Sequence, residues 1–108
     1  MIAQEHAEEE LRPTMLHDHA VIVGFGRVGG LVGTELRQRS WPLLVIEDAV
    51  EAVERLKILG IETIQGNAAE DRVLAAANLA QARILLIAIP NAFEAGQIVK
   101  RTPTLEGR

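Results

Sequence analysis

A glycine-rich turn between two apolar segments limits the folds open to this chain more than any other stretch. The turn reads Gly24-Phe25-Gly26-Arg27-Val28-Gly29, which has the spacing G-x-G-x-x-G. A short β-branched apolar run, residues 20–24, leads into it. An amphipathic helical pattern, residues 28–38, leads out of it, with an apolar face toward the sheet formed by Val28, Leu31, Val32 and Leu36. A strand before this spacing and a helix after it are typical of the first turn of a nucleotide-binding α/β sheet.

Each glycine of the turn has its own predicted role. Gly24 permits the tight turn, Gly26 lets a pyrophosphate approach bare backbone, and Gly29 lets the helix pack closely on the strand. The phosphates would lie at the helix N-terminus, where free N–H groups and the helix dipole favour an anion, and Arg27 would add a positive charge there. Because glycines also form ordinary tight turns, a structural turn without a ligand is the alternative.

The rest of the chain continues the alternation of strand and helix. The predicted strands are residues 20–24, 43–47, 61–65 and 83–89, and the predicted helices are residues 28–38, 48–59, 71–77 and 91–100. Strict alternation predicts the α/β class, with a Rossmann-like doubly wound parallel sheet and right-handed crossovers. Asp48 with Glu51, and Asn91 with Glu94, have the spacing of capping boxes that open helices. Gly60 is the expected end of the second helix.

An acidic residue at the end of the second strand is the second requirement of a dinucleotide site, because it accepts hydrogen bonds from ribose hydroxyls. Glu47 meets this requirement, and Asp48 beside it is better explained as a helix cap, although we count it with the candidate site. A carboxylate at this position favours NAD(H) or a simple adenosine ligand over one with a 2′-phosphate. The alternative for Glu47 is a solvated side chain at a strand end.

Two further loops lie where strands end, which is where open α/β sheets bind ligands. Asn67 and Ala68 follow the third strand, and their small size leaves room for an adenine ring. Ala88 and Asn91 follow the fourth strand and would line the far side of the nucleotide. A turn residue at Asn67 and a helix N-cap at Asn91 are equally good explanations of the two amides.

Composition sets limits on the partners of this chain. Its 108 residues make one domain or a piece of one, and its net charge of −4 gives no electrostatic basis for binding nucleic acid. It has no cysteine, which fits a reducing interior, and no apolar run of about 20 residues that would insert into a membrane. We therefore expect a cytoplasmic location, with any membrane association arising through a partner.

Residues 1–18 are expected to form a polar linker or a short solvated helix, because they carry the acidic run Glu8–Glu10 and are interrupted by Pro13. The sequence His17-Asp18-His19 offers two imidazoles but no identified further metal ligand. An exposed segment is therefore favoured there over a metal site.

Several of these segments together resemble the TrkA-N, or RCK N-terminal, domain, in the version fused to Kef-type cation:proton antiporters. The likeness covers residues 19–100. It lies in the runs 19–29 (His-Ala-Val-Ile-Val-Gly-Phe-Gly-Arg-Val-Gly), 45–48 (Val-Ile-Glu-Asp), 66–68 (Gly-Asn-Ala) and 87–96 (Ile-Ala-Ile-Pro-Asn-Ala-Phe-Glu-Ala-Gly). The resemblance implies a cytoplasmic regulatory domain that binds NAD(H), AMP, ATP or a related adenine nucleotide, forms a homodimer, and acts on the potassium or cation transporter to which it is joined.

The resemblance also implies roles for individual residues. Gly24, Gly26, Arg27, Val28 and Gly29 would contact the phosphates, with Phe25 in the same loop. Glu47 would bind the ribose, and Asn67 with Ala68 would lie on the adenine side.

This chain departs from the family pattern in two places. Many relatives have aspartate where this chain has Asn67. The family domain also continues for two more strands, whereas residues 101–108 resemble neither strand and read as a disordered or truncated tail. The resulting strand order is 3-2-1-4, which leaves the apolar fourth strand with an unpaired edge that invites association with another chain.

We considered two alternatives to a regulatory nucleotide sensor. The first is the cofactor domain of an NAD-dependent oxidoreductase. The chain has no tyrosine, no cysteine and no histidine after His19, so the common proton donors of hydride chemistry are missing from the folded part. The second is a fragment that keeps the fold signature without a function. We favour the sensor, which is not an enzyme and in which a nucleotide shifts the balance between domain arrangements.

Overall fold

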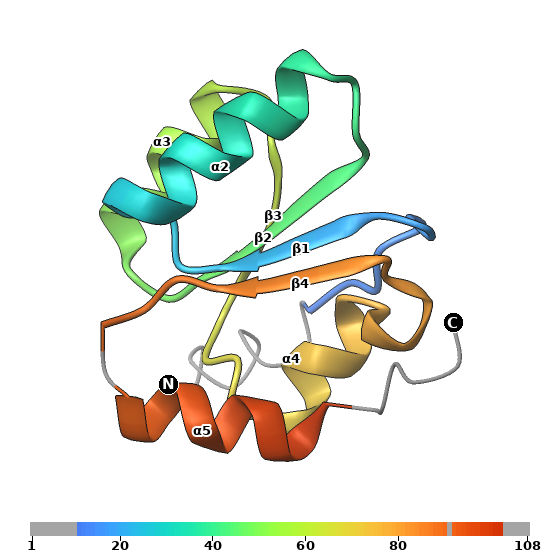
Figure 1. The fold of residues 1–108 in the computed structure, drawn as a ribbon, viewed down its shortest axis with the longest axis vertical. Helices are drawn as coiled ribbons and strands as arrows, with labels where there is room; N and C mark the ends of the chain where they lie inside the picture. The colour runs from blue at the N-terminus through green and yellow to red at the C-terminus, as the bar shows by residue number, and fades with distance from the viewer. Residues whose placement is uncertain (1–10, 91, 103–108) are drawn as a thin grey trace, which may run out of the picture.

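A four-stranded parallel sheet in the order β3-β2-β1-β4 forms the centre of the structure (Figure 1). The computed structural model describes residues 11–90 and 92–102. The strands are β1 (Ala20–Val23), β2 (Leu43–Glu47), β3 (Glu62–Gln65) and β4 (Ile84–Ile87). In the sheet, Ala20 is aligned with Leu43 on one side and Ile84 on the other, and Leu44 is aligned with Glu62. The predicted Rossmann-like class and strand order are confirmed.

Helices cover both faces of this sheet. They are α2 (Arg27–Gln38), α3 (Val50–Ile58), α4 (Asp71–Ala76) and α5 (Ala92–Arg101), with a short 3₁₀ turn, η2 (Leu79–Gln81), before β4. Helices α2 and α3 lie on one face of the sheet, and α4 and α5 lie on the other (Figure 1). This is the three-layer arrangement that right-handed crossovers between parallel strands produce.

Two apolar cores follow from the alternation of side chains along the strands. Val21 and Val23 of β1 belong to the core that α4 and α5 cover, which includes Ile98 of α5. Ala20 and Ile22 point the other way, into the core that includes Leu56 of α3. Strands β1 and β2 are aliphatic at nearly every position because both of their faces are buried.

Strand β4 is shorter and less buried than the sequence suggests. The prediction gave it residues 83–89, and the structure gives it Ile84–Ile87. It lies at one edge of the sheet, and Ile84 is 38% exposed. The predicted homodimer, which this edge would favour, stays a prediction.

The predicted apolar face of the first helix is wrong at two positions. Val28 and Leu31 were expected to face the sheet, yet they are 58% and 70% exposed. The buried residues of α2 are Gly29 and Gly33. The physical reason is that the helix backbone itself approaches the strand turn, so residues without side chains must face inward and the larger ones point outward.

The predicted capping box at the second helix is also wrong. The N-cap of α3 is Ala49, and no side-chain cap is present there among the described residues. Asp48 therefore does not cap the helix. Instead, the backbone N–H groups of Asp48 and Ala49 donate to the carboxylate of Glu47, which takes the place of a cap. The helix end was predicted correctly, because Gly60 follows it with a φ of +77°.

His19 is fully buried, although the sequence placed it in an exposed segment. Its Nε2 lies 2.9 Å from the carbonyl oxygen of Ala77, which can only accept, so Nε2 carries the proton. The preceding segment also contacts the domain, since the Thr14 N–H donates to the Ala76 carbonyl at 2.8 Å and the Asp18 N–H donates to the Gln81 carbonyl at 2.8 Å. His19 thus joins the start of β1 to the end of α4.

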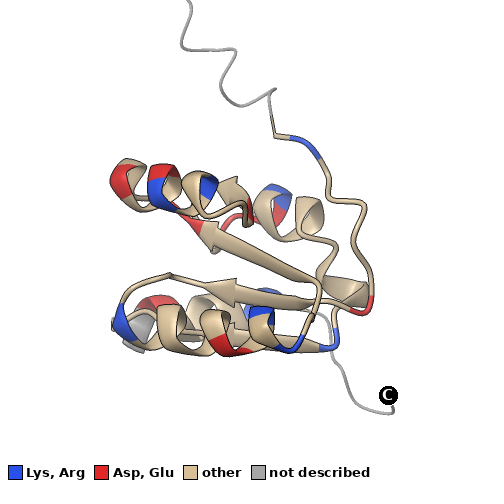
Figure 2. Cartoon of the chain, turned by 90° about the horizontal axis from the view of Figure 1, so that it is seen from above, with Lys and Arg blue, Asp and Glu red and all other residues tan. Residues whose placement is uncertain are grey.

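Charged residues lie mainly on the helices and connecting loops, around a sheet that is largely without charge (Figure 2). Among residues 11–90 and 92–102, none of the helices has the length and apolar character needed to cross a membrane.

Candidate nucleotide site

The turn from β1 into α2 depends on two of its glycines. Gly24 has a φ of +89°, and a Cβ there would lie 2.9 Å from the carbonyl oxygen of Ala88. A Cβ on Gly29 would overlap the carbonyl oxygen of Gly24. Gly24 therefore allows both the left-handed backbone and the close approach of the β4 loop, and Gly29 allows α2 to rest on the turn, as predicted for these two positions.

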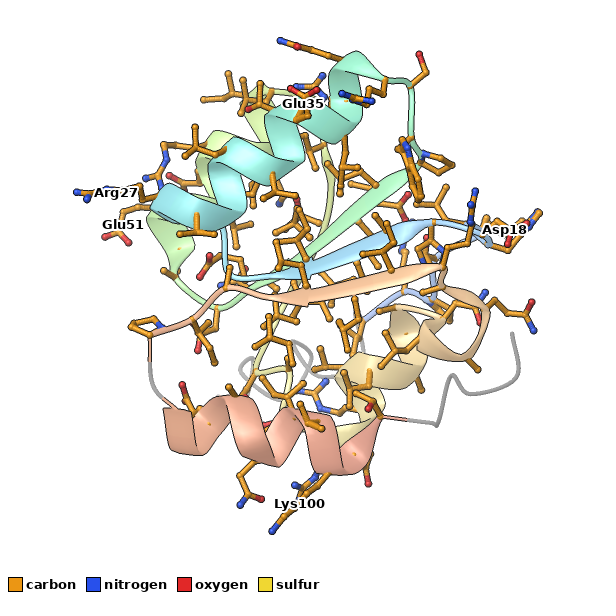
Figure 3. The ribbon with its side chains drawn as sticks, viewed as in Figure 1. Asp18, Arg27, Glu35, Glu51 and Lys100 are labelled. Atoms are coloured by element: carbon orange, nitrogen blue, oxygen red, sulfur yellow. The ribbon has the colours of Figure 1, made fainter. Side chains whose placement is uncertain are left out.

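Gly26 faces open space. A Cβ built on it meets no atom within 4 Å, and the residue is exposed. It is the N-cap of α2, which receives no side-chain cap from the described residues, so the first N–H groups of this helix are available to an anion. Arg27 and Val28 follow on the exposed side, and Arg27 points outward at the end of the molecule opposite Asp18 (Figure 3).

Phe25 contributes its backbone to the site and its ring to the core. The ring packs with the core that includes Ile22 and Leu56. It also explains Gly33 of α2, because a Cβ there would lie 2.7 Å from the ring, whereas a Cβ on Gly30 would lie at an ordinary 3.8 Å from it. The Phe25 ring thus fixes how closely α2 approaches the turn.

The Glu47 carboxylate lies directly beside this turn. Its Oε1 accepts the backbone N–H of Phe25 at 2.8 Å. Its Oε2 accepts the N–H groups of Asp48 at 3.2 Å and Ala49 at 3.3 Å. Glu47 is half-buried at the carboxyl end of β2, so its negative charge is held next to the glycine turn by three backbone donors.

A pocket opens beside Glu47, at the carboxyl ends of the strands. It is lined by Val23, Gly24, Ile46, Glu47, Asp48, Gly66, Asn67, Ala68, Ile89, Glu94 and Ile98. The structure thus brings together five of the predicted site residues around one cavity. Gly26, Arg27 and Val28 lie outside its lining, at the exposed start of α2, and Ala88 faces Gly24 instead of the cavity. Asn91 lies outside the described residues.

Asn67 has a turn role in this structure. Its Oδ1 accepts the N–H of Ala69 at 2.8 Å, which closes the turn before α4. The same residue also lines the pocket. The turn role of Asn67 is therefore confirmed, and its contact with a ligand stays a prediction.

The lining also includes residues outside the predicted site, among them Glu94 and Ile98. Both belong to α5, one face of which closes the cavity. The signal was present, since an i, i+4 pair on the helix after the fourth strand shares one face. Glu94 had been assigned only to a capping box with Asn91.

The lining is rich in acceptors and acidic. Glu47, Asp48 and Glu94 contribute three carboxylates, and the described residues that line the cavity include no lysine or arginine. Among residues 11–90 and 92–102, no group of three or more acidic, histidine or cysteine side chains is arranged to hold a metal ion. Such a cavity can accept hydrogen bonds from hydroxyl and amine groups, while the start of α2 beside it can hold an anion.

Comparison with known proteins gives a consistent result. The TrkA-N domain family model matches residues 20–107. YbaL of Escherichia coli (strain K12), which is named as a cation/proton antiporter, is 41% identical over 97 residues, which are 89% of this chain and 17% of YbaL. The crystal structure of the TrkA-N domain of YbaL matches with a TM-score of 0.78 and 38% identity, over 83% of this chain and 70% of that one.

Two further structures resemble this chain. The Kef CTD from Shewanella denitrificans, in its AMP-bound form, matches with a TM-score of 0.66 and 28% identity, over 76% of this chain and 48% of that chain. The GsuK channel bound to NAD matches with a TM-score of 0.70 over 90% of this chain and 19% of that chain. Its identity of 22% makes this a likeness of fold alone.

Proposed function

The chain belongs to the TrkA-N domain family, and from this premise we propose that it is a regulatory domain that binds an adenine nucleotide and controls a cation:proton antiporter. The ligand is NAD(H) or a mononucleotide such as AMP or ATP. In this proposal the domain binds the nucleotide and does not change it chemically. The domain acts because the nucleotide favours one arrangement of the transporter's regulatory part over another.

One observation carries the proposal. The bare backbone at Gly26 starts a helix with uncapped N–H groups, and it lies beside a pocket with the half-buried carboxylate of Glu47. An anion-binding helix start next to a hydroxyl acceptor is what a nucleoside phosphate requires. The phosphates rest on the start of α2, the ribose bonds to Glu47, and the adenine lies toward Asn67 and Ala68.

The relatives support both halves of the proposal. The Kef CTD, at 28% identity, was solved with AMP, a nucleotide without a 2′-phosphate. YbaL is named for cation/proton antiport, and this chain corresponds to 17% of its length. The transporter itself therefore comes to this chain by analogy with YbaL, as part of the proposal.

Polar groups in the pocket favour binding over catalysis. The polar side chains among the described lining residues are three carboxylates and the amide of Asn67. The chain contains no tyrosine or cysteine, and His17 and His19 lie next to Asp18, at the end of the molecule away from Arg27 (Figure 3). Hydride transfer to a small carbonyl needs a proton donor beside the cofactor, and no such group lines this pocket within the described chain.

Thermal unfolding with a ligand panel tests the binding half. NADH, NAD, AMP and ATP are compared with NADPH, whose 2′-phosphate would meet the carboxylates of Glu47 and Asp48. A nucleotide present at 100 times its Kd stabilises the fold by about 2.7 kcal/mol. We expect the first group to raise the Tm and NADPH to raise it much less. No shift with any nucleotide contradicts the proposal, and an equal shift with NADPH contradicts the ribose role of Glu47.

The proposed control of transport is tested with the same ligands in a chimeric transporter. The TrkA-N domain of YbaL is replaced by this chain, and cation/proton exchange is followed in membrane vesicles. A nucleotide that binds the isolated domain should change the exchange rate, and a Gly26→Val chimera is the matched control. If the nucleotide binds the domain but does not change the exchange rate, the chain is a binding module and the proposed control of the antiporter is refuted.

A further inference from the structure

We infer that Glu47 holds the glycine turn and the start of α3 in position before any nucleotide binds, so that it supports phosphate binding as well as ribose binding. This inference rests on the proposed function for its ligand and on the ligand-free geometry for its mechanism. The carboxylate joins two loops through three hydrogen bonds, to Phe25 on one side and to Asp48 and Ala49 on the other. We call this arrangement the Glu47 clasp.

The bond to Phe25 acts on the part of the turn that most needs support. Phe25 stands between Gly24 and Gly26, and glycine backbones lose more conformational freedom on ordering than those of any other residue. The Gly24 N–H donates to the Ile46 carbonyl at 2.9 Å and the Gly30 N–H donates to the Gly26 carbonyl at 2.9 Å. Between these two backbone bonds, the Glu47 carboxylate is the partner that holds the Phe25 amide.

The bonds to Asp48 and Ala49 act on the start of α3. These two N–H groups precede a helix whose N-cap, Ala49, has no side chain able to accept a hydrogen bond. The carboxylate oxygen of Glu47 accepts from both and adds a negative charge at a helix N-terminus, which is favourable. One side chain therefore fixes the two loops between which the nucleotide would lie.

The clasp leaves room for the ribose. A carboxylate offers about four lone-pair sites, and the three backbone donors use three of them. One hydroxyl can therefore bond to Glu47 without displacing the turn. A turn that is already ordered binds phosphate more tightly, since less conformational freedom is lost on binding.

This leads to a result that the ribose role alone does not predict. If Glu47 acted only on ribose hydroxyls, removing its carboxylate would not affect a ligand that lacks those hydroxyls. If Glu47 also positions the turn, that ligand must bind more weakly too. Glu47 is in this sense a positioning residue for the phosphate loop.

Amide hydrogen exchange in the ligand-free protein tests the clasp directly. Hydrogen bonds to charged groups contribute about 1.5–3 kcal/mol, which corresponds to about a tenfold to hundredfold change in protection. We expect the Phe25 and Ala49 amides to exchange at least about tenfold faster in Glu47→Ala, with a smaller effect in Glu47→Gln. The matched control is Asp48→Asn, which removes the neighbouring charge and none of the side-chain bonds. Unchanged exchange at Phe25 in Glu47→Ala, with the Val45 amide still protected, would overturn the clasp.

The second arm compares ATP with 2′,3′-dideoxy-ATP by titration calorimetry. Glu47→Ala should weaken both ligands, the dideoxy form by about threefold to tenfold through loss of turn order. Wild-type affinity of Glu47→Ala for the dideoxy ligand would limit Glu47 to the ribose and refute the inference. If the wild-type protein binds neither ligand, the proposed function fails, and the exchange experiment still decides the clasp on its own.

Discussion

Replacing Gly26 with valine tests the phosphate end of the proposed site. A Cβ at Gly26 meets no atom within 4 Å, but the residue has φ −84° and ψ −138°, a combination outside the regions that residues with a Cβ prefer. We therefore expect Gly26→Val to lower the free energy of unfolding by about 1–3 kcal/mol through backbone strain, without a steric clash. The same Cβ projects into the space where the phosphates are proposed to lie.

The effect on binding can be worked out from the donors that would be lost. A branched side chain on Gly26 keeps the phosphates away from the first N–H groups of α2, whose bonds to an anion contribute about 1.5–3 kcal/mol each. Losing one such bond lowers the affinity about tenfold to hundredfold, and losing two multiplies the effect. We expect Gly26→Val to lower the affinity for NADH or AMP by at least about a hundredfold, and Gly26→Ala by about tenfold.

Titration calorimetry on the two Gly26 variants, paired with urea unfolding, measures both quantities. Gly29→Ala provides a steric comparison, because its Cβ overlaps the carbonyl oxygen of Gly24 and must push α2 away from the turn. That variant should lose about 1–3 kcal/mol of stability with or without ligand. Wild-type affinity in Gly26→Val would show that the phosphates lie elsewhere, and a loss of stability well above about 3 kcal/mol in the same variant would show that its side chain meets other atoms and does not enter open space.

Two further predictions concern stability alone. Gly30→Ala should stabilise the protein by about 0.5–1 kcal/mol through helix propensity, because its Cβ would lie at an ordinary 3.8 Å from the Phe25 ring. Gly33→Ala should destabilise the protein by about 1–3 kcal/mol, because its Cβ would lie only 2.7 Å from that ring. Urea unfolding of both variants measures these changes. If both substitutions changed the free energy of unfolding in the same direction, the position of the Phe25 ring would be contradicted. His19→Ala should cost about 2–4 kcal/mol, because it leaves the buried Ala77 carbonyl without its donor and opens a cavity, while the exposed control His17→Ala should change stability by less than about 0.5 kcal/mol. A small effect at His19 in thermal unfolding would show that this bond contributes little.

The features of the fold that depend on the local sequence alone could be predicted. The parallel sheet and the roles of Gly24 and Gly29 follow from apolar runs, alternation and a turn that only glycine allows, whereas the strand order followed from the family resemblance; all agree with the structure. The errors arose where local spacing was not enough to fix a contact. Asp48 had the right spacing for a helix cap, but the N-cap is Ala49, and the side chain that contacts this turn is Glu47, which accepts the N–H groups of Asp48 and Ala49.

The inward face of α2 was missed for a related reason. Hydrophobic periodicity assumes that large apolar side chains face the core, and here the backbone approaches so closely that Gly29 and Gly33 face inward. The burial of His19 depends on the Ala77 carbonyl, 58 residues away, which no local pattern reports. The contribution of α5 to the pocket depends on where that helix crosses the sheet, and a sequence pattern gives a face but no position.

The charges around the pocket decide how a nucleotide would be oriented in it. Glu47, Asp48 and Glu94 place three carboxylates in the lining, so a phosphate would be repelled from the cavity itself. The adenosine of the proposed ligand suits this lining better, since its ribose hydroxyls and adenine amine are donors that suit carboxylate acceptors. The phosphates must then extend over Gly26 toward Arg27, where the uncapped helix N–H groups are the nearest favourable partners. A 2′-phosphate would point back toward the carboxylates, and for this reason the same geometry that admits NADH or AMP should discriminate against NADPH.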